Sequence, residues 1–309
     1  MCEFPLGLRT AMESGKCILF LGAGLGEHIS DPDGNPAPDS IALAKELADN
    51  FKINVQDNYN LSQIASVIEI RHRRPELIAF LKKRLSNLNP DDYYQWLFKL
   101  RWSCIFTTNY DNVIERAYEL IPDPLQNPIS ISVVSDIVDY DPRFQIPIFH
   151  IHGSIYSPDE QKILITEEDY AKFREPRRMM FELLKIKFAT NPVLYVGYSN
   201  KDPNWKIIIS EITAEFYPKE IPQSYRISPF TENLDEEILE SKNVRTIKST
   251  YKEFYGVAST ILSPVSQDSS LFTAVRNKVP SDLLHHFEEN PAPVTRLISS
   301  WDYVSQEVF

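Results

Sequence analysis

Short apolar runs that end in glycine or polar residues recur along the chain, and longer stretches with apolar residues three or four apart lie between them. The short runs predict buried strands, and the longer stretches predict amphipathic helices. The predicted strands are residues 17–21, 103–107, 129–134, 146–151, 193–197, 224–228 and 244–248. Because strands alternate with helices, we expect a Rossmann-like α/β fold, a mostly parallel sheet with helices on both faces.

The helical pattern also predicts how the chain is divided. Asp39 or Ser40 should cap a helix that reaches Asn50 and buries Ile41, Ala44, Leu47 and Ala48. With further helices up to residue 100, it forms a helical insertion over about 41–100, after the first strand. Residues 1–262 are expected to form one domain. The composition then shifts to Ser, Pro and Asn, so 263–309 reads as a peripheral or linker segment leading toward a further domain.

Charge and cysteine content narrow the function classes. The net charge is −11, so we expect no direct nucleic-acid binding, and the basic clusters at 71–74 and 82–84 read as solvated helix faces. Three cysteines without a C-x-x-C pair predict no zinc module and no other metal site, and they suit a reducing cytoplasm. No apolar run approaches the roughly 18 residues of a membrane span, so a cytoplasmic location without membrane contact is expected.

Four predicted strands end in polar or glycine-rich segments. These are Gly22-Ala23-Gly24, Thr107–Asp111, His152-Gly153-Ser154, and Gly197–Ser199 with Asp202. Ligands of open parallel sheets bind beyond the carboxyl ends of the strands, so these segments should gather at one edge.

Each segment also has a plainer interpretation. The glycine turn could hold a pyrophosphate or could simply need small residues for packing. Asn109, Asp111 and Asp202 could cap the helices that follow them. His152 could be a buried histidine with satisfied hydrogen bonds. His150 would share its face if the strand stays regular, and it reads as a core histidine.

Together the segments resemble the sirtuin family, and specifically the sirtuin-like domains of bacterial antiphage defence proteins. G-A-G at 22–24, T-T-N-Y-D at 107–111, H-G-S at 152–154 and G-Y-S-x-x-D at 197–202 carry the resemblance. Residues 165–170, I-T-E-E-D-Y, are also similar to the segment that follows the histidine motif in those domains. The resemblance covers roughly residues 15–250.

The resemblance implies NAD as substrate and assigns roles by matching position. Asn109 would contact the nicotinamide ribose and position the attacking water, and His152 would be the general base. The cofactor-binding residues would be Gly22, Ala23, Gly24, Thr108, Asp111, Gly197, Ser199 and Asp202. Within that set the glycine turn would hold the pyrophosphate, Asp111 the nicotinamide amide, and the 197–202 segment the adenosine half.

Three departures from the family pattern bear on the cofactor loop. Gly26 stands where the family commonly has serine, Pro38-Asp39 replaces a proline-aromatic pair, and the loop 27–40 is longer than usual. The missing cysteine pairs matter more, because the peptide cleft of protein-deacylating sirtuins lies beside their zinc module. The resemblance therefore favours hydrolysis of NAD itself.

These observations predict an NAD glycohydrolase that produces nicotinamide and ADP-ribose, and that depletes NAD as an effector of antiphage defence. The alternatives are an NAD-dependent protein deacylase or ADP-ribosyl transferase, and a non-catalytic module that binds NAD or ADP-ribose. An unrestrained NAD hydrolase would poison its own cell, so we expect control by a homo-oligomer or by a fused or separate sensor protein.

Overall fold

The computed structural model describes residues 3–54, 59–133, 136–137, 140–141, 145–157, 162–172, 174–198, 203–230 and 233–262. Ser199, Asp202 and the segment 263–309 lie outside the described residues, so the predictions made for them stay predictions.

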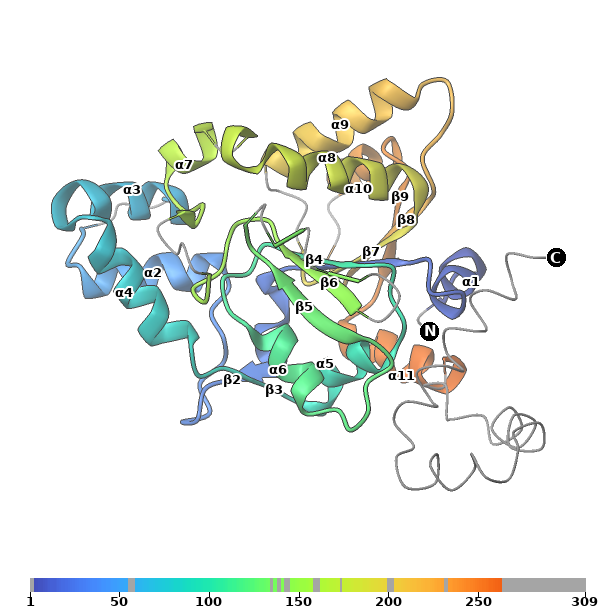
Figure 1. Cartoon of the computed structure of the whole chain (residues 1–309), viewed down its shortest axis with the longest axis horizontal. Helices are drawn as coiled ribbons and strands as arrows, with labels where there is room; N and C mark the ends of the chain where they lie inside the picture. Colours follow the sequence, from blue (N-terminus) through green and yellow to red (C-terminus); the bar gives the residue numbers. More distant parts are fainter. Residues whose placement is uncertain are drawn as a thin grey trace.

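Seven strands form one sheet in the order β5-β6-β4-β1-β7-β8-β9, and every pairing between neighbours in it is parallel (Figure 1). They are β1 (Ile18–Leu21), β4 (Ile105–Thr107), β5 (Asn127–Ile131), β6 (Gln145–His150), β7 (Val193–Val196), β8 (Ser224–Ser228) and β9 (Val244–Lys248). Two short strands, β2 (Ile29–Ser30) and β3 (Asn89–Pro90), pair antiparallel in a separate sheet. The predicted Rossmann-like fold class is confirmed.

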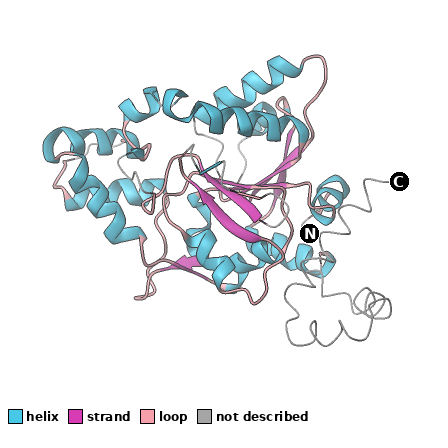
Figure 2. Cartoon of the chain, viewed as in Figure 1, coloured by secondary structure: helices cyan, strands magenta, loops and turns pink. Residues whose placement is uncertain are grey.

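The connections between the strands are mostly helical (Figure 2). The helices are α1 (Leu6–Glu13), α2 (Ser40–Asn50), α3 (Leu61–His72), α4 (Arg74–Leu85), α5 (Asp92–Trp96), α6 (Val113–Glu119), α7 (Glu167–Lys172), α8 (Arg174–Thr190), α9 (Pro203–Phe216), α10 (Asn233–Glu240) and α11 (Tyr251–Ile261). Two short 3₁₀ helices, η1 (Ala23–His28) and η2 (Leu97–Lys99), complete the set. None of the helices in the described part of the chain has both the length and the apolar character needed to cross a bilayer.

The sheet separates two apolar cores. In β1, Leu19 and Leu21 face a core that includes residues of α1 to α6 and α11, whereas Ile18 and Phe20 face a core that includes α8, α9 and α10. This division follows from the alternation of side chains along a strand. Because both faces are covered, the strands read as continuous apolar runs instead of alternating with polar residues.

Two details of the sequence prediction are wrong. Ile41 was expected in the buried face of α2, but it is 79% exposed, and Leu43 is buried with Ala44, Leu47 and Ala48 instead. The predicted strand 129–134 begins earlier, at Asn127, and ends at Ile131. The N-cap of α2 is Asp39, whose carboxylate accepts the N–H groups of residues 41 and 42. Asp39 was one of the two residues expected to cap this helix.

Candidate functional site

The four segments singled out in the sequence follow four adjacent strands, β6, β4, β1 and β7. Backbone hydrogen bonds continue beyond the strands and join the segments in pairs. The acceptors are backbone carbonyl oxygens: Ile151 N–H donates to that of Thr107 at 3.0 Å. Thr108 N–H donates to that of Leu21 at 3.4 Å, and Gly22 N–H to that of Val196 at 3.1 Å. The expected gathering of the segments at one edge of the sheet is therefore what the structure shows.

Two glycine turns touch through their backbones at this edge. A Cβ on Gly22 would lie 2.5 Å from the Gly197 carbonyl oxygen, and a Cβ on Gly197 would lie 2.9 Å from the Gly22 oxygen. Gly24 N–H donates to the Gly197 carbonyl at 2.8 Å, and Gly197 has φ +64°. Small residues are therefore required here by packing alone, the plainer of the two interpretations. Contact of the same turn with a pyrophosphate stays a prediction.

The departure at Gly26 has a physical reason. A Cβ at this position would lie 2.3 Å from the carbonyl oxygen of Ala37, so the loop 27–40 can close against η1 only over a glycine. Within the loop, the carboxylate of Asp31 accepts the N–H groups of Asp33 and Asn35. Arg84 of α4 donates to the Pro36 carbonyl at 2.9 Å. The longer loop is therefore held by its own contacts.

Asn109 and Asp111 lie in the turn between β4 and α6, and both are buried. The backbone N–H of Asn109 donates to Thr107 Oγ1 at 3.0 Å. Asp111 Oδ1 accepts the Val113 N–H at 3.0 Å from one residue before the N-cap of α6, which is Asn112. Burial raises the pKa of Asp111 above its ordinary value, although the Val113 hydrogen bond and the charge of His150 act in the opposite direction.

His152 lies in a turn, not in the strand. β6 ends at His150, where Gly153 N–H donates back to the His150 carbonyl at 2.9 Å and Gly153 adopts φ +86°. The regular strand that would place both histidines on one face therefore does not continue to residue 152. His152 faces the α8 and α9 side of the sheet, whereas His150 contacts α6 on the other side.

Arg177 of α8 holds this turn in place. Its guanidinium is buried and donates to the carbonyls of His150 and Ile151 at 3.2 and 3.1 Å, and to Lys162 at 2.8 Å. Burial lowers the pKa of Arg177 to about 10. A Cβ on Gly153 would lie 2.9 Å from Arg177 Nη2, so the glycine of the H-G-S segment is needed for both its φ and this approach.

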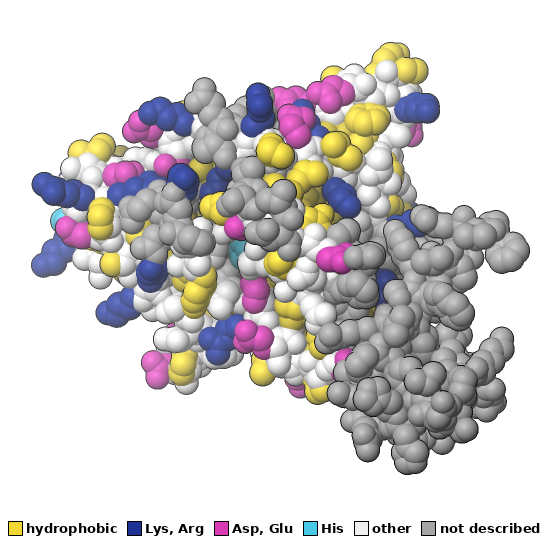
Figure 3. All heavy atoms as spheres, in the orientation of Figure 1, with side chains coloured by type: hydrophobic (Ala, Val, Ile, Leu, Met, Phe, Trp, Pro, Cys, Tyr) yellow, Lys and Arg dark blue, Asp and Glu magenta, His cyan; other side chains and the backbone are white. Residues whose placement is uncertain are grey.

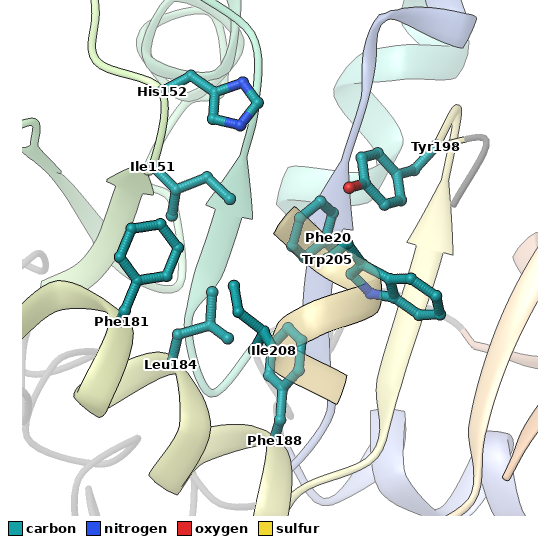
Figure 4. Close-up of a pocket in the computed structure, with 9 residues that line it drawn as sticks. All are labelled: Phe20, Ile151, His152, Phe181, Leu184, Phe188, Tyr198, Trp205 and Ile208. Atoms are coloured by element: carbon teal, nitrogen blue, oxygen red, sulfur yellow. The ribbon is translucent and has the colours of Figure 1, made fainter. Parts of the chain in front are cut away.

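His152 lies at one end of an apolar pocket between the sheet, α8 and α9 (Figure 4). The pocket encloses about 270 Å³ of empty space, part of it open to solvent. Its lining is almost wholly hydrophobic: Phe20, Ile151, His152, Phe181, Leu184, Phe188, Tyr198, Trp205 and Ile208.

Tyr170 of α7 is the polar neighbour of His152. Its hydroxyl lies 3.5 Å from His152 Nδ1, and the two rings meet edge to face at 5.4 Å. The start of α7 is fixed by Thr166 Oγ1, which accepts the Asp169 N–H, and by the Asp169 carboxylate, which accepts the Thr166 N–H. Arg74 of α4 pairs with Asp169 at 3.0 Å. The I-T-E-E-D-Y segment thus positions an aromatic hydroxyl beside the candidate base.

A second polar cluster lies on the opposite side of the sheet. His150 is 1% exposed, and its Nε2 lies 2.9 Å from Glu115 Oε1 of α6. Ser130 of β5 donates to the same carboxylate oxygen. Burial alone would lower the pKa of His150, but the charge and hydrogen bond of Glu115 outweigh it, so the pKa is raised above 6.5. The predicted core histidine is therefore buried, but in an ion pair.

One arginine in each of the basic clusters at 71–74 and 82–84 forms ion pairs with acidic side chains. Arg74 contacts Glu69 and Asp169, and Arg84 contacts Glu46 at 2.7 Å. Figure 3 shows Lys and Arg side chains interspersed with acidic ones on the visible face. Among the described residues, no group of three or more His, Cys, Asp or Glu side chains is arranged to hold a metal ion.

Several residues of this site were missed in the sequence. Arg177 and Glu115 lie inside ordinary amphipathic helices, and nothing in their spacing indicates that they reach the strand ends. Phe181, Leu184 and Phe188 recur at helical spacing, which predicts a core face but not an open pocket. Tyr170 alone carried a signal, since it closes the I-T-E-E-D-Y segment.

Comparisons with known proteins identify the domain. Residues 103–247 match the model of a SIR2-like domain, which spans the second, third and fourth of the distinctive strand ends but not the G-A-G turn. NAD(+) hydrolase ThsA from Enterococcus faecium is 26% identical over 218 residues, which cover 65% of this chain and 41% of that protein. NAD(+) hydrolase ThsA from Cytobacillus dafuensis is 24% identical over 203 residues, which cover 65% of this chain and 39% of that protein.

The chain thus spans about two fifths of the length of these relatives. It contains a SIR2-like domain and is homologous to the ThsA NAD(+) hydrolases, which confirms the resemblance to sirtuin-like domains.

Proposed function

We propose that this SIR2-like chain is an NAD glycohydrolase that cleaves NAD to nicotinamide and ADP-ribose. The observation that carries the proposal is the junction of the Asn109 and His152 segments. They follow adjacent strands, β4 and β6, joined by the hydrogen bond from Ile151 N–H to the Thr107 carbonyl. The homology to NAD(+) hydrolases supports the same substrate.

The reaction needs little beyond these residues. The nicotinamide of NAD is a positively charged ring, so it leaves with the electron pair of the glycosidic C–N bond as a neutral amide, without a general acid. Water then attacks the ribosyl carbon. The Asn109 amide would orient the water and the ribose hydroxyls, and His152 would accept the proton that the water loses, a role that typically contributes ~10²–10⁴ in rate.

The surroundings of His152 suit this role. Arg177 and the Gly153 turn fix its backbone, and the Tyr170 hydroxyl lies near Nδ1. The other walls of the pocket are mainly apolar rings and aliphatic chains, which limit how many competing waters can stay near the ribosyl cation. The glycine turns would lie under the rest of the dinucleotide, with Ala23, Thr108 and Asp111 beside it.

The test is product analysis of purified protein incubated with NAD, with and without an acetylated peptide. We expect nicotinamide and free ADP-ribose in equal amounts, independent of the peptide. Strict dependence on the peptide would establish a deacylase instead. ADP-ribose found attached to protein would establish a transferase. Binding of NAD without nicotinamide release would establish a non-catalytic module.

We further propose that the activity serves antiphage defence by depleting cellular NAD, under control of self-association or of a fused or separate sensor protein. The homology is the support for this step. The rate of NAD cleavage per subunit should rise with oligomer size, measured by light scattering on the same samples. A monomer with the full rate, unchanged by concentration, would remove control by self-association.

A further inference from the structure

His150 makes contacts that the proposed chemistry does not use. It ends β6 and is almost wholly buried, and each of its ring nitrogens lies near an oxygen acceptor. Nε2 is 2.9 Å from the Glu115 carboxylate, and Nδ1 is 3.4 Å from the backbone carbonyl of Asn109. A neutral imidazole carries one N–H and can donate to only one of these oxygens. Only the doubly protonated ring donates to both.

We propose that His150 is a positioning residue, doubly protonated at neutral pH, that holds the Asn109 backbone in its working place. This inference rests on the proposed function, because Asn109 matters here as the residue that orients water. The Asn109 peptide is held from two sides: its N–H donates to Thr107 Oγ1 at 3.0 Å, and its carbonyl accepts from His150. The imidazolium thereby links the turn after β4 to the end of β6.

The charges around His150 fit this protonation state. Glu115 on α6 is the direct partner, and Ser130 on β5 donates to the same carboxylate oxygen. Asp111, in the turn before α6, adds a second carboxylate nearby, and burial together with the charges of both carboxylates raises the pKa of Tyr94 of α5. The positive charge of Arg177 of α8 reaches His150 at its backbone carbonyl, to which it donates at 3.2 Å, and not at the ring.

Two substitutions separate the two contacts of the ring. The amide nitrogen of an asparagine side chain lies near the place of Nδ1, whereas that of a glutamine lies near the place of Nε2. His150→Asn should therefore keep the donor to the Asn109 carbonyl and lose the donor to Glu115. His150→Gln should keep the donor to Glu115 and lose the one to Asn109.

The experiment measures kcat and KM for NAD cleavage, and the melting temperature, for the wild type, both His150 variants and Asn109→Ala. We expect His150→Gln to be the more stable variant but to lose about 10- to 100-fold in kcat relative to His150→Asn, with KM little changed. A purely structural role predicts the reverse order of kcat, because the activity would then follow the melting temperature. That reverse order would overturn the inference.

Nitrogen NMR of the labelled wild-type protein gives a reading that needs neither variant to fold. Both ring nitrogens of His150 should carry protons at pH 7, where an ordinary histidine is mostly neutral. A ring with one protonated nitrogen there would also overturn the inference. The proposed function fails separately, if the wild type and Asn109→Ala release nicotinamide equally.

Discussion

His150 and His152 are two residues apart, yet they lie in opposite surroundings. His150 ends β6 on the α6 side of the sheet, where a carboxylate, a hydroxyl and a backbone carbonyl surround it. His152 lies in the following turn on the α8 and α9 side, at the end of a pocket of aromatic and aliphatic side chains (Figure 4).

The difference arises from the backbone and not from the side chains. A continued strand would give both histidines the same neighbours, but the turn at Gly153 rotates the second one to the other face. The two rings therefore have different surroundings at one strand end. His150 is tied to a carboxylate, and His152 borders the small apolar pocket where our proposal places the substrate.

The strongest test of this comparison is His152→Ala. The rate of nicotinamide release should fall by ~10²–10⁴, the usual contribution of a general base. The protein should stay folded, because the residue lies in the turn after β6 and not in the middle of the sheet. Release can be followed by chromatography, with circular dichroism melting as the control for folding. Near-wild-type turnover would take the histidine out of the mechanism.

The opposite result is expected on the other face, for Glu115→Ala. Removal of the carboxylate leaves the buried His150 ring without its charged partner, at a cost of about 3 kcal/mol in the free energy of unfolding. Urea denaturation at pH 7 would measure it. If Glu115→Ala is as stable as His152→Ala, the charge of Glu115 does not stabilise the surroundings of His150.

Gly153→Ala tests the turn that separates the two histidines. Its positive φ and the nearness of Arg177 Nη2 should together cost about 2 kcal/mol of stability, and the displaced His152 should lower the activity. Gly34→Ala is the matched control, because Gly34 has φ +83° but no atom within 4 Å of an added Cβ. Equal losses in both variants would mean that the contact with Arg177 does not matter.

The pH dependence of stability sharpens the comparison further. The folded state raises the pKa of His150 above 6.5. The contribution of the protonated ring to stability is therefore complete below about pH 6.5 and is lost as the pH rises through the pKa of the folded state. Burial raises the pKa of Glu115, but the charge and hydrogen bond of His150 and the hydrogen bond of Ser130 together outweigh it. The net pKa is lowered below 4.5, so the contribution of Glu115 to stability is lost as the pH falls through the lower value.

The stability gap between the wild type and Glu115→Gln should therefore be widest between these limits and shrink by roughly 1 kcal/mol at alkaline pH. Asp111 is present in both proteins, so its own titration largely cancels in the difference. Denaturation midpoints measured from pH 4 to pH 10 would show the effect, and a gap that grows between pH 7 and pH 10 would contradict the assigned signs.

Tyr170→Phe should have the smallest effect. Its hydroxyl is 3.5 Å from His152 Nδ1, a long contact, so its loss should lower the rate less than about tenfold. The ring stays and keeps its edge-to-face contact with the imidazole. A loss as large as that of His152→Ala would show that the hydroxyl takes a direct part in the chemistry.

The sequence predicts the scaffold of this site better than its contents. The strand order could not be read from it, but seven apolar runs did locate the seven strands, and the polar segments after four of them do meet at one edge. Such local patterns suffice because buried parallel strands are continuous apolar runs. Ile41 shows the limit, since it is exposed in the first turn of α2 and Leu43 is buried beside Ala44 in its place.

The remaining features depend on contacts between distant segments. The orientation of His152 is set by Gly153 and by Arg177 from α8, and the state of His150 by Glu115 from α6. Neither helix residue differs in local pattern from a solvent-facing one. Only the fold brings these side chains to the strand ends, so periodicity and capping signals could not have found them.

The position of β1 has a consequence for how the chain folds during synthesis. β1 (18–21) is made early, but its two neighbours in the sheet are β4 (105–107) and β7 (193–196). Until the ribosome has produced residue 196, this central strand lacks at least one partner, and the Gly22–Gly197 contact cannot form. Contacts between such distant segments form slowly, because the long intervening loops must close first. A nascent chain that stops before β7 therefore exposes an apolar strand edge and lacks the Gly22–Gly197 contact, so the proposed NAD cleavage should appear only late in translation.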